Sequence, residues 1–498
     1  MPPAVKSEVL LLGIDLGSSG VKVTLFSTEK GILNSATSNV DLISKYPGWS
    51  EADTNDWLKA TSLAIKELFD ISRVHGNQIS AVAISGMVPA LVICDEQGNS
   101  LRNAILQNDA RANFEISILK AKLKDLDFLK KTGSTISQQS IIPKLMWLAK
   151  NEKELFANTK IVLGSYDWLA LQIGAKPSIE SNWALESGIF SVELKPLDEI
   201  RNAAGINWPT LPEVVYPGEV IGEINQKGHE ITGLPIGVPI VVGGADHVLS
   251  AYGAGLVNEG DCLVKLGGAG DILVVSNKIN IDSRLYLDLH PITGKWLPNG
   301  CMATSGSLLR WEQSIFNNIS LTDLDDAAAK SKPGNLITLP YFLGEKTPLN
   351  DPDLRGVMIG MNLSTTQGDI HRSFLEAIAY GFKAHIQVFE LCNISINSIK
   401  VTNGGSKSKL WREILADVLN QELRSIVQHP GASLGAAIAA GIGIKAIDNW
   451  EVINEFVEVG QVIKPNDKNI EIYQSRFEDF IELGKSTKEI SHNLAKHQ

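Results

Sequence analysis

The sequence predicts an α/β protein built from two related halves, and three observations support this prediction. The chain has 498 residues, which is too long for one compact core and favours two domains. Apolar strand-like runs alternate with helix-like segments in both halves. A strand–turn–strand pattern with a turn of small residues occurs twice, as expected of an internal duplication.

The first copy of this pattern covers residues 12–23. An apolar strand reaches Asp15, small residues follow at Gly17, Ser18 and Ser19, and a second alternating strand begins after them. Small residues let bare backbone N–H groups approach a large anion, and a carboxylate at a strand end can hold a hydrated Mg²⁺ ion. We therefore expect Asp15 as a metal ligand beside a phosphate-binding turn. The alternative is an ordinary glycine-bearing hairpin.

The second copy covers residues 264–273, and its glycines fall at the same offset as those of the first copy. Its turn is formed by Gly267, Gly268 and Ala269. The repetition favours the phosphate interpretation of both turns. It predicts that a nucleotide lies in a cleft between two halves, each of which offers one turn.

Composition narrows the class of protein. The net charge of −11 argues against nucleic acid or an anionic membrane as a partner, although turns can still bind phosphate locally. There is no apolar run of about 18 residues and no apolar leader in residues 1–8, so we expect no membrane span and no signal peptide. The four cysteines lie far apart without CxxC spacing, which favours reduced thiols in a cytoplasmic protein over disulfides or zinc.

The expected elements of the first half end at a domain junction between residues 245 and 246. Strands are expected near 9–15, 21–27, 79–85, 90–94 and 240–246. Helices are expected near 54–69, 143–156 and 166–173, the first capped by Asp53 or Thr54. Residues 178–217, which carry Trp183 and Trp208, are expected to be an irregular insertion over the core. The predicted domains are 1–245 and 246–498.

The second half repeats the alternation. Strands are expected near 261–266, 271–276 and 399–402, and helices near 371–391, 407–419, 433–444 and 470–498. The small residues of the helix near 433–444 are expected to serve tight helix packing. The last helix is expected to be a charged surface helix and tail.

In this order, the motifs resemble those of the FGGY carbohydrate kinase family, and most closely its xylulokinase-like branch. Besides the two turns, the matching stretches are Trp-Ser-Glu-Ala-Asp at 49–53, Gln-Asn-Asp-Ala-Arg at 107–111, Gly-Gly-Ala-Asp at 243–246, Ser-Gly-Ser at 305–307, Leu-Gly-Glu-Lys-Thr-Pro at 343–348, Asn-Gly-Gly-Ser-Lys-Ser at 403–408 and Pro-Gly-Ala-Ser-Leu-Gly-Ala-Ala at 430–437. The resemblance implies two actin-like, ribonuclease-H-like domains with an ATP and sugar cleft between them. It also implies transfer of the γ-phosphoryl group of ATP to a hydroxyl of a small sugar or polyol, with Mg²⁺.

Asp246 matches the catalytic aspartate of that family. Phosphoryl transfer needs alignment, charge neutralisation and a group that accepts the proton of the hydroxyl. Asp246 ends an apolar strand after two glycines, at the expected domain junction, so we expect it to be the general base. The alternative is a helix N-cap, because Asp246 also opens the segment 247–254, and the two roles are compatible.

The resemblance also assigns nucleotide contacts. Asp15 and the turn after it should hold Mg²⁺ and the β- and γ-phosphates, while Lys22 is expected to be a solvated strand residue. The family usually has Thr-Ser where this chain has Gly268 and Ala269, so hydroxyl contacts to phosphate are lost while backbone N–H groups remain. The adenine ring is expected to lie on the backbone of Gly404, Gly405 and Ser406, with a plain strand-to-helix turn as the alternative.

Sugar contacts are expected from the first half. By the resemblance they are Met87, Asn108, Asp109, Arg111 and His247. Asn and Asp side chains offer complementary donors and acceptors to vicinal hydroxyls, and such matching discriminates strongly between substrates. The alternatives are a loop salt bridge between Asp109 and Arg111 and a surface pair of Glu345 and Lys346.

Three departures from the xylulokinase-like pattern fall in the sugar pocket. Val88 stands where the family has a substrate-facing His, His247 stands where it has Asn, and Gln107 replaces a Trp. A D-xylulose-like ketopentose is the main expectation, and ribulose, erythritol, xylitol, glycerol and gluconate stay open. Two alternatives that do not phosphorylate a sugar are an actin-like ATPase switch that binds a protein and a catalytically silent sugar sensor. A homodimer is one admissible assembly.

Overall fold

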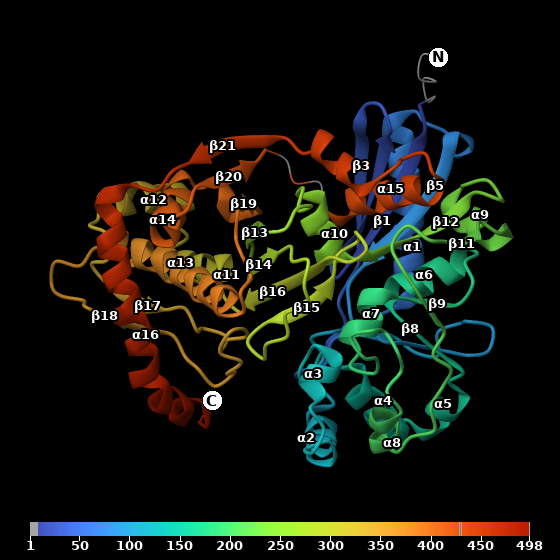
Figure 1. The fold of residues 1–498 in the computed structure, drawn as a ribbon, viewed down its shortest axis with the longest axis horizontal. Helices are drawn as coiled ribbons and strands as arrows, with labels where there is room; N and C mark the ends of the chain where they lie inside the picture. Colours follow the sequence, from blue (N-terminus) through green and yellow to red (C-terminus); the bar gives the residue numbers. More distant parts are fainter. Residues whose placement is uncertain (1–7, 428, 430, 498) are drawn as a thin grey trace. The chain divides into compact units, whose positions relative to one another are not determined.

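Two mixed sheets with a similar arrangement of central strands organise the chain in the computed structural model, which describes residues 8–427, 429 and 431–497 (Figure 1). The chain divides into two units. Unit 1 comprises Met1–Val257, Asp288–Lys295 and Pro430–Val457, and unit 2 comprises Asn258–Leu287, Trp296–His429 and Glu458–Gln498. The boundary predicted between 245 and 246 falls inside unit 1. The expectation that residues 1–245 bind the sugar and residues 246–498 bind the adenine stays a prediction. Pro430 of the family motif and Gln498 of the predicted tail lie outside the described residues.

The sheet of unit 1 has six strands in the order β11-β12-β5-β1-β2-β3. Their bounds are β1 Leu10–Gly17, β2 Gly20–Ser27, β3 Gly31–Asn39, β5 Ile79–Gly86, β11 Val220–Glu223 and β12 Pro239–Ala245. β1 forms an antiparallel hairpin with β2, while β1, β5 and β12 run parallel. The register pairs Asp15 with Ser85 and Ala245 with Gly86, so the three parallel strands end at the same edge.

The second sheet has seven strands in the order β15-β16-β14-β13-β19-β20-β21, and it belongs to unit 2 except for the last two residues of β15, which belong to unit 1. The bounds are β13 Asp261–Leu266, β14 Gly270–Val274, β15 Tyr286–Leu289, β16 Trp296–Met302, β19 Ser398–Thr402, β20 Leu423–Ile426 and β21 Val459–Ile463. β13 forms a hairpin with β14 and runs parallel to β19, which runs parallel to β20. This is the pattern of β1, β2, β5 and β12, so the duplication predicted from the two turns is confirmed.

Helices and short strands complete the units. Those of unit 1 are β4 Glu51–Ala52, α1 Thr54–Ser72, β6 Val92–Cys94, β7 Ala104–Ile105, α2 Asn113–Lys122, α3 Phe128–Thr132, α4 Ile141–Asn151, α5 Lys153–Asn158, β8 Ile161–Leu163, α6 Ser165–Ile173, β9 Ser178–Glu180, α7 Ser181–Glu186, α8 Asp198–Ala204, β10 Glu213–Val215, α9 Gln226–Thr232, α10 Asp246–Gly253 and α15 Ala432–Gly443. Those of unit 2 are α11 Gly306–Ile315, α12 Leu321–Ala328, β17 Ile337–Leu339, β18 Val357–Ile359, α13 Gln367–Leu391, α14 Lys409–Leu419 and α16 Asp467–Ala495. Most predicted elements are present within a few residues, including α1 with Asp53 as its N-cap.

Two predictions about the first half are wrong. The helix expected at 143–156 is interrupted at Glu152, which has φ −127° and whose carboxylate accepts a 2.6 Å hydrogen bond from Arg102. The segment 178–217 is not an irregular insertion, because it contains β9, α7, α8 and β10. Trp183 is fully buried, and its indole N–H donates to the carbonyl of Ala90 at 2.7 Å. This segment is therefore part of the core of unit 1.

The small residues of α15 allow this helix to lie directly on the sheet of unit 1, although it is far from β1 in the sequence (Figure 1). A Cβ atom on Gly13 would lie 1.9 Å from the carbonyl oxygen of Ser433, and one on Gly435 would lie 2.8 Å from that of Leu249. The hydroxyls of Thr24 and Ser433 are hydrogen-bonded at 2.8 Å. The predicted packing role of the small residues is confirmed.

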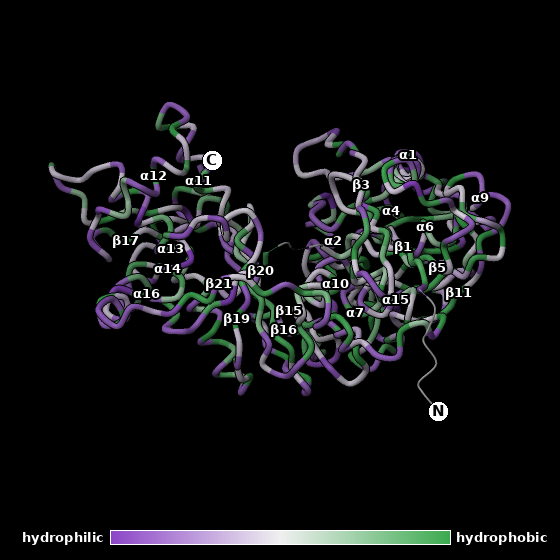
Figure 2. The backbone as a smooth tube through the Cα atoms, turned by 90° about the horizontal axis from the view of Figure 1, so that it is seen from above, coloured by the Kyte–Doolittle hydropathy of each residue, from purple (hydrophilic) through white to green (hydrophobic). Residues whose placement is uncertain are grey.

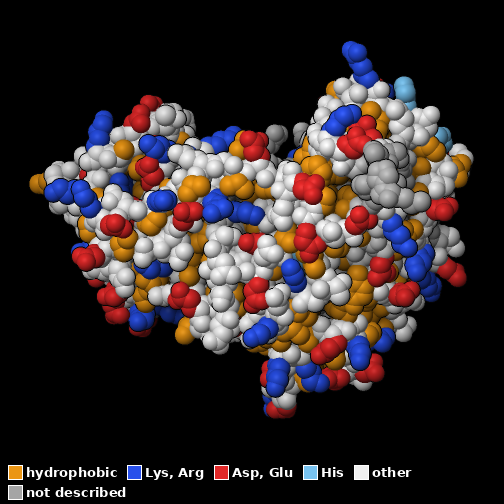
Figure 3. Space-filling model, turned by 45° about the horizontal axis from the view of Figure 1, so that its top comes forward, with side chains coloured by type: hydrophobic (Ala, Val, Ile, Leu, Met, Phe, Trp, Pro, Cys, Tyr) orange, Lys and Arg blue, Asp and Glu red, His pale blue; other side chains and the backbone are white. Residues whose placement is uncertain are grey.

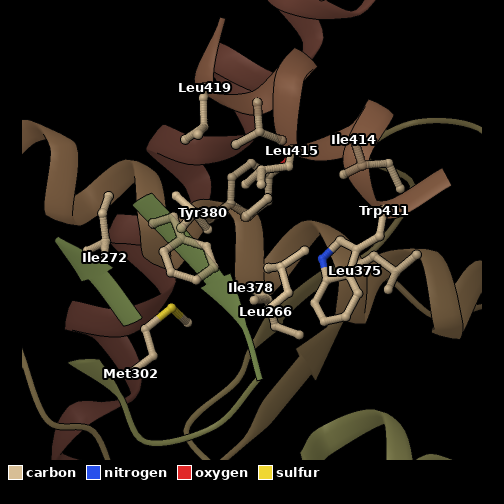
Figure 4. Packing of buried hydrophobic residues seen from close by; sticks show 14 of the residues in the cluster. Leu266, Ile272, Met302, Leu375, Ile378, Tyr380, Trp411, Ile414, Leu415 and Leu419 are labelled. Atoms are coloured by element: carbon tan, nitrogen blue, oxygen red, sulfur yellow. The ribbon is translucent and has the colours of Figure 1, made fainter. Parts of the chain in front are cut away.

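The core of unit 2 is a cluster of buried apolar side chains from the sheet and from α13, α14 and α16. Figure 4 shows Trp411 beside Leu266 and Leu375, with Tyr380 and Met302 further along the cluster. α16 is largely hydrophilic in Figure 2 and buries only Tyr473, Phe477, Phe480 and Ser491 among its described residues. It is thus the charged surface helix that the sequence predicted.

Acidic and basic side chains are interspersed over the face shown in Figure 3. The four cysteines are unpaired; Cys94 and Cys262 are buried, and Cys301 and Cys392 are half-buried. Within the described part of the chain, every helix is too short or too polar to cross a lipid bilayer.

A buried histidine joins three helices of unit 2. His371 on α13 lies 2.6 Å from a carboxylate oxygen of Glu312 on α11 and 3.0 Å from one of Asp325 on α12. Burial by itself lowers the pKa of His371, but the hydrogen bonds with Asp325 and Glu312 outweigh it and raise the pKa to about 9. His371 is therefore a buried imidazolium at neutral pH.

We expect His371 to make unit 2 less stable at alkaline pH. Because its pKa is raised from 6.5 to about 9 on folding, its stabilising effect is complete below pH 6.5 and is lost as the pH rises through about 9. The advantage of the wild-type chain over His371→Gln should therefore shrink over this range, by up to about 3 kcal/mol. Thermal unfolding of both proteins between pH 6 and pH 9.5 measures it. A difference that does not depend on pH would contradict the ionised state of His371.

Candidate functional site

Two carboxylates and a hydroxyl lie at the carboxyl edge of the unit 1 sheet. Asp15 lies near the end of β1, Ser85 lies opposite it on β5, and Asp246 follows the last residue of β12. The hydroxyl of Ser85 lies 3.5 Å from Asp15 Oδ1. Because the parallel strands end together, this edge brings together residues that are far apart in the sequence, and it is the ordinary location of a binding site in such sheets.

The turn between β1 and β2 leaves its small residues accessible. Ser18 and Ser19 are exposed, and Gly17 is half-buried. Lys22 is not the solvated residue that the sequence predicted. It is half-buried and paired with Asp15 across the hairpin, and burial lowers its pKa despite the opposing charge of Asp15.

Asp246 is the first residue of α10, and the N-cap of this helix is Ala245 rather than Asp246. The N-cap alternative is therefore wrong, although Asp246 Oδ1 accepts the N–H of His247 at 2.6 Å. About a third of the Asp246 side chain (35%) is exposed. A carboxylate at a helix N-terminus benefits from the helix dipole, and this one keeps a face free for a ligand.

The imidazole of His247 lies between two carboxylates. Its Nε2 is 2.7 Å from Asp288 Oδ2, and its Nδ1 is 3.5 Å from Asp246 Oδ1. Burial lowers the pKa of His247, but the charge of Asp288 and the hydrogen bonds with Asp246 and Asp288 raise it well above its usual value. Burial, followed by the charge of Asp288, raises the pKa of the neighbouring Glu186 well above its usual range.

Glu186 and Asp288 were not singled out from the sequence. Glu186 lies in the segment that was expected to be irregular, and Asp288 lies in β15 without any recognisable motif around it. The one feature of the sequence that could have pointed to Glu186 is the apolar Trp183, which indicates that residues 181–186 form a buried helix rather than a surface loop. Nothing in the sequence pairs Glu186 with a residue more than a hundred positions away.

In unit 2, the second turn is held by the start of α11. The backbone N–H of Gly306 donates to the carbonyl of Gly267 at 2.7 Å, and those of Ser305 and Ser307 donate to the carbonyl of Gly268 at 2.9 and 3.0 Å. The carbonyls of Gly267 and Gly268 thus accept hydrogen bonds from backbone N–H groups of unit 2 itself. Residues 267–269 are all half-buried. The turn matches the first one in sheet position, and its role as a phosphate site stays a prediction.

The glycine pair after β19 lies beside this turn, since the position of a Cβ on Gly267 is 3.2 Å from Asn403 Nδ2. The two glycines differ. A Cβ on Gly404 would have no other atom within 4 Å, whereas one on Gly405 would lie 2.3 Å from the Trp411 ring. Gly405 is required by core packing, whereas Gly404 is exposed and has room for a side chain. Ser406 is half-buried, and its hydroxyl donates to the carbonyl of Asn403 at 2.7 Å.

Asp109 and Arg111 form the salt bridge that the sequence analysis offered as the alternative. Arg111 donates to both carboxylate oxygens of Asp109, at 2.8 and 2.7 Å, and contacts Glu51 at 2.7 Å. The guanidinium stacks on Trp49, 3.7 Å from the ring centroid, and the side chains of Asp109 and Arg111 are fully buried. Burial alone would raise the pKa of Asp109, but the hydrogen bonds from Arg111 and Ser50 lower it below its usual value.

The other predicted sugar contacts differ in accessibility. Asn108 is exposed and His247 is partly exposed, whereas Met87 is only 1% exposed. Glu345 is 5% exposed, so the surface-pair alternative for Glu345 and Lys346 is wrong. Burial raises the pKa of Glu345 to about 7, against the hydrogen bonds from the backbone of Ala303 and Lys346.

Comparison with known proteins identifies the class. The sequence matches the N-terminal domain of the FGGY family of carbohydrate kinases over residues 10–253 and its C-terminal domain over residues 280–444. The chain belongs to this family. It is therefore an enzyme that transfers a phosphoryl group from ATP to a sugar, which excludes the ATPase switch and the silent sugar sensor.

Individual relatives agree with this assignment. A xylulose kinase of Staphylococcus epidermidis is 29% identical over 497 residues, covering 97% of this chain and 98% of the relative. The crystal structure of a xylulose kinase from Rhodospirillum rubrum superimposes with a TM-score of 0.92 at 32% identity, covering 97% of this chain and all of that chain (100%). A gluconokinase of Bacillus subtilis is 24% identical over 507 residues, covering 98% of both chains.

We expect Asp109→Asn to destabilise the protein, because it removes one of the two carboxylates that pair with the buried guanidinium of Arg111. Breaking a buried ion pair typically costs about 3–5 kcal/mol of unfolding free energy. Replacement of the exposed neighbour in Asn108→Ala should change stability by less than about 0.5 kcal/mol. Denaturant unfolding measures both. An Asp109→Asn protein of unchanged stability but a raised KM for sugar would make Asp109 a substrate ligand instead.

Proposed function

We propose that this enzyme phosphorylates a hydroxyl of a D-xylulose-like ketopentose, with Asp246 as the general base. The observation that carries the proposal is the position of Asp246 at the carboxyl edge of the unit 1 sheet, beside the strand that ends near Asp15. The names of the relatives support the sugar, since both the S. epidermidis and the R. rubrum proteins are xylulose kinases.

The proposed reaction needs one proton transfer and one displacement at phosphorus. The carboxylate of Asp246 takes the proton of the sugar hydroxyl as its oxygen attacks the γ-phosphorus of ATP. A bond forms between that oxygen and phosphorus, and the bond from phosphorus to the bridging β-phosphate oxygen breaks. ADP leaves with the electron pair, and the proton remains on Asp246 until solvent removes it.

Asp15 is the residue that we propose as the Mg²⁺ ligand. It is half-buried at a strand end, its side chain faces the hydroxyl of Ser85, and a hard divalent cation prefers oxygen ligands of this kind. Bound Mg²⁺ would neutralise charge on the phosphates. The N–H groups and hydroxyls of Ser18 and Ser19, with Gly17, are proposed to contact the phosphates beside it.

Sugar binding is assigned to the side chains that remain accessible. We propose that Asn108 and His247 contact sugar hydroxyls directly. Asp109 is committed to Arg111, whose Nη1 is the one guanidinium nitrogen without a hydrogen-bond partner among the described residues. Met87, which is buried, would shape the pocket wall rather than form hydrogen bonds.

The charge around Asp246 favours a neutral sugar over a sugar acid. Asp246 and Asp288 are carboxylates, His247 carries one compensating positive charge, and the raised pKa of Glu186 keeps that group protonated. The local sum is negative, and it would repel the carboxylate of gluconate where desolvation strengthens the interaction. This supports a ketose or polyol over the gluconate alternative.

Replacement of the base in Asp246→Asn should abolish most turnover. Loss of a general base typically reduces the rate about 10²–10⁴-fold. ATP binding, measured by calorimetry, should change little, because the amide has nearly the same size as the carboxylate. ADP release is measured over D-xylulose, D- and L-ribulose, erythritol, xylitol, glycerol and gluconate, with Asp246→Asn as the blank.

The highest kcat/KM in this panel is expected for D-xylulose. A preference for gluconate would contradict the charge argument and leave the kinase assignment intact. A fully active Asp246→Asn enzyme would refute the role of Asp246 whatever the sugar.

The two glycines after β19 provide a matched pair for the adenine site. Gly404→Ala should keep its stability, because there is room for the methyl group, and should raise the KM for ATP several-fold if adenine lies on this backbone. Gly405→Ala should lose about 1–3 kcal/mol of stability, because its methyl group overlaps Trp411. Thermal unfolding and ATP titration of both variants test this. An unchanged KM in Gly404→Ala would place adenine elsewhere.

The assembly of the protein as a homodimer and its location in the cytoplasm stay predictions.

A further inference from the structure

Four ionisable side chains gather around the N-terminus of α10 in unit 1. Glu186 comes from α7, Asp288 from β15, and Asp246 and His247 from α10 itself. Ligand atoms of Glu186, His247 and Asp288 all lie within 4.8 Å of one another. The His247 ring lies between Asp288, 2.7 Å from Nε2, and Asp246, 3.5 Å from Nδ1. The proposed base is thus one end of a row of interacting groups.

The backbone fixes the far end of this row. Asn182, on the same helix as Glu186, accepts the N–H of Leu289 at 2.7 Å and donates to its carbonyl at 3.1 Å. The N-cap of α7 is Glu180, whose buried carboxylate accepts the N–H of Asn182 at 2.9 Å. Asp288, the residue before Leu289, is therefore held beside Glu186.

Accessibility falls along the row. The side chain of Asp246 is 35% exposed, that of His247 28%, and that of Asp288 only 2%. A sugar can reach the first two, but it cannot reach Asp288 without displacing protein. Any effect of Asp288 on the reaction must therefore pass through His247.

We infer that Asp288 and Glu186 are positioning residues that hold the ring of His247, and that the ring in turn keeps the Asp246 carboxylate oriented for the sugar hydroxyl. The inference rests on the proposed function of Asp246. It goes beyond that function, because it assigns a role in the reaction to two residues that do not touch the substrate.

The charges of the row explain how it would act. Asp288 stabilises the imidazolium form of His247, whose Nδ1 lies 3.5 Å from Asp246 Oδ1. Burial and the charge of Asp288 raise the pKa of Glu186, so Glu186 stays protonated beside Asp288. If Asp288 loses its charge, His247 releases its proton more easily and Asp246 loses its positive neighbour.

The test is the pH profile of kcat/KM for sugar between pH 5 and pH 9, whose acid limb reports the ionisation of the base in the free enzyme. In Asp288→Asn we expect the acid limb to move to higher pH by about 1–3 units, as when an opposite charge is removed beside a carboxylate. His247→Asn should move it in the same direction. The double variant should show no further shift, because both changes remove one interaction.

Two further variants separate this role from a general loss of stability. Glu186→Gln keeps a neutral donor beside Asp288, so its acid limb should move less than that of Asp288→Asn. Leu68→Ala, which opens a cavity in the core under α1, should lower stability by about 2–5 kcal/mol and leave the acid limb in place.

Distinct outcomes separate the two proposals. An unshifted acid limb in both Asp288→Asn and His247→Asn, with an inactive Asp246→Asn enzyme, would overturn this inference and leave the base assignment standing. An active Asp246→Asn enzyme would remove the proposed function first. A stoichiometric transition-metal ion that is bound by the purified wild type and lost in Asp288→Asn would also overturn the inference.

Discussion

The common end of three parallel strands is the constraint on which the site of unit 1 depends. Parallel strands in register expose their carboxyl ends at one edge, so residues separated by more than two hundred positions become neighbours there. Asp15 and Asp246 owe their shared edge to the strand β5 between β1 and β12. A one-residue slip in either pairing would turn one side chain to the opposite face of the sheet. The register of β5 with β1 and β12 therefore determines whether Asp15 and Asp246 can act at the same site.

Close packing enforces that register. The backbone of α15 lies so near β1 that even a methyl group on Gly13 would overlap it. The hydrogen bond between Thr24 and Ser433 ties the same helix to β2. In a densely packed interior a strand held in this way cannot shift gradually, because any shift costs overlap or leaves a void. The small residues of the chain therefore serve the site indirectly, by fixing the strands that carry it.

Features with local causes could be predicted from the sequence. The two hairpin turns, most strands and helices, the cap of α1 and the duplication follow from periodicity and from the positions of small residues. Asp246 was found because it follows an apolar strand and a glycine pair. Glu186 and Asp288 could not be predicted as neighbours. Their proximity depends on the hydrogen bond between Asn182 and the backbone of Leu289, which joins segments that are distant in the sequence. The partnership of Asp109 with Arg111 was open in the sequence and is decided by burial and by Trp49.

The most direct test of this account is a crystal structure of the Asp246→Asn protein with D-xylulose and a non-hydrolysable ATP analogue. The account predicts a sugar hydroxyl within hydrogen-bond distance of the residue 246 side chain, with the ring of His247 still in contact with Asp288. A sugar bound away from the carboxyl ends of β1, β5 and β12 would contradict it.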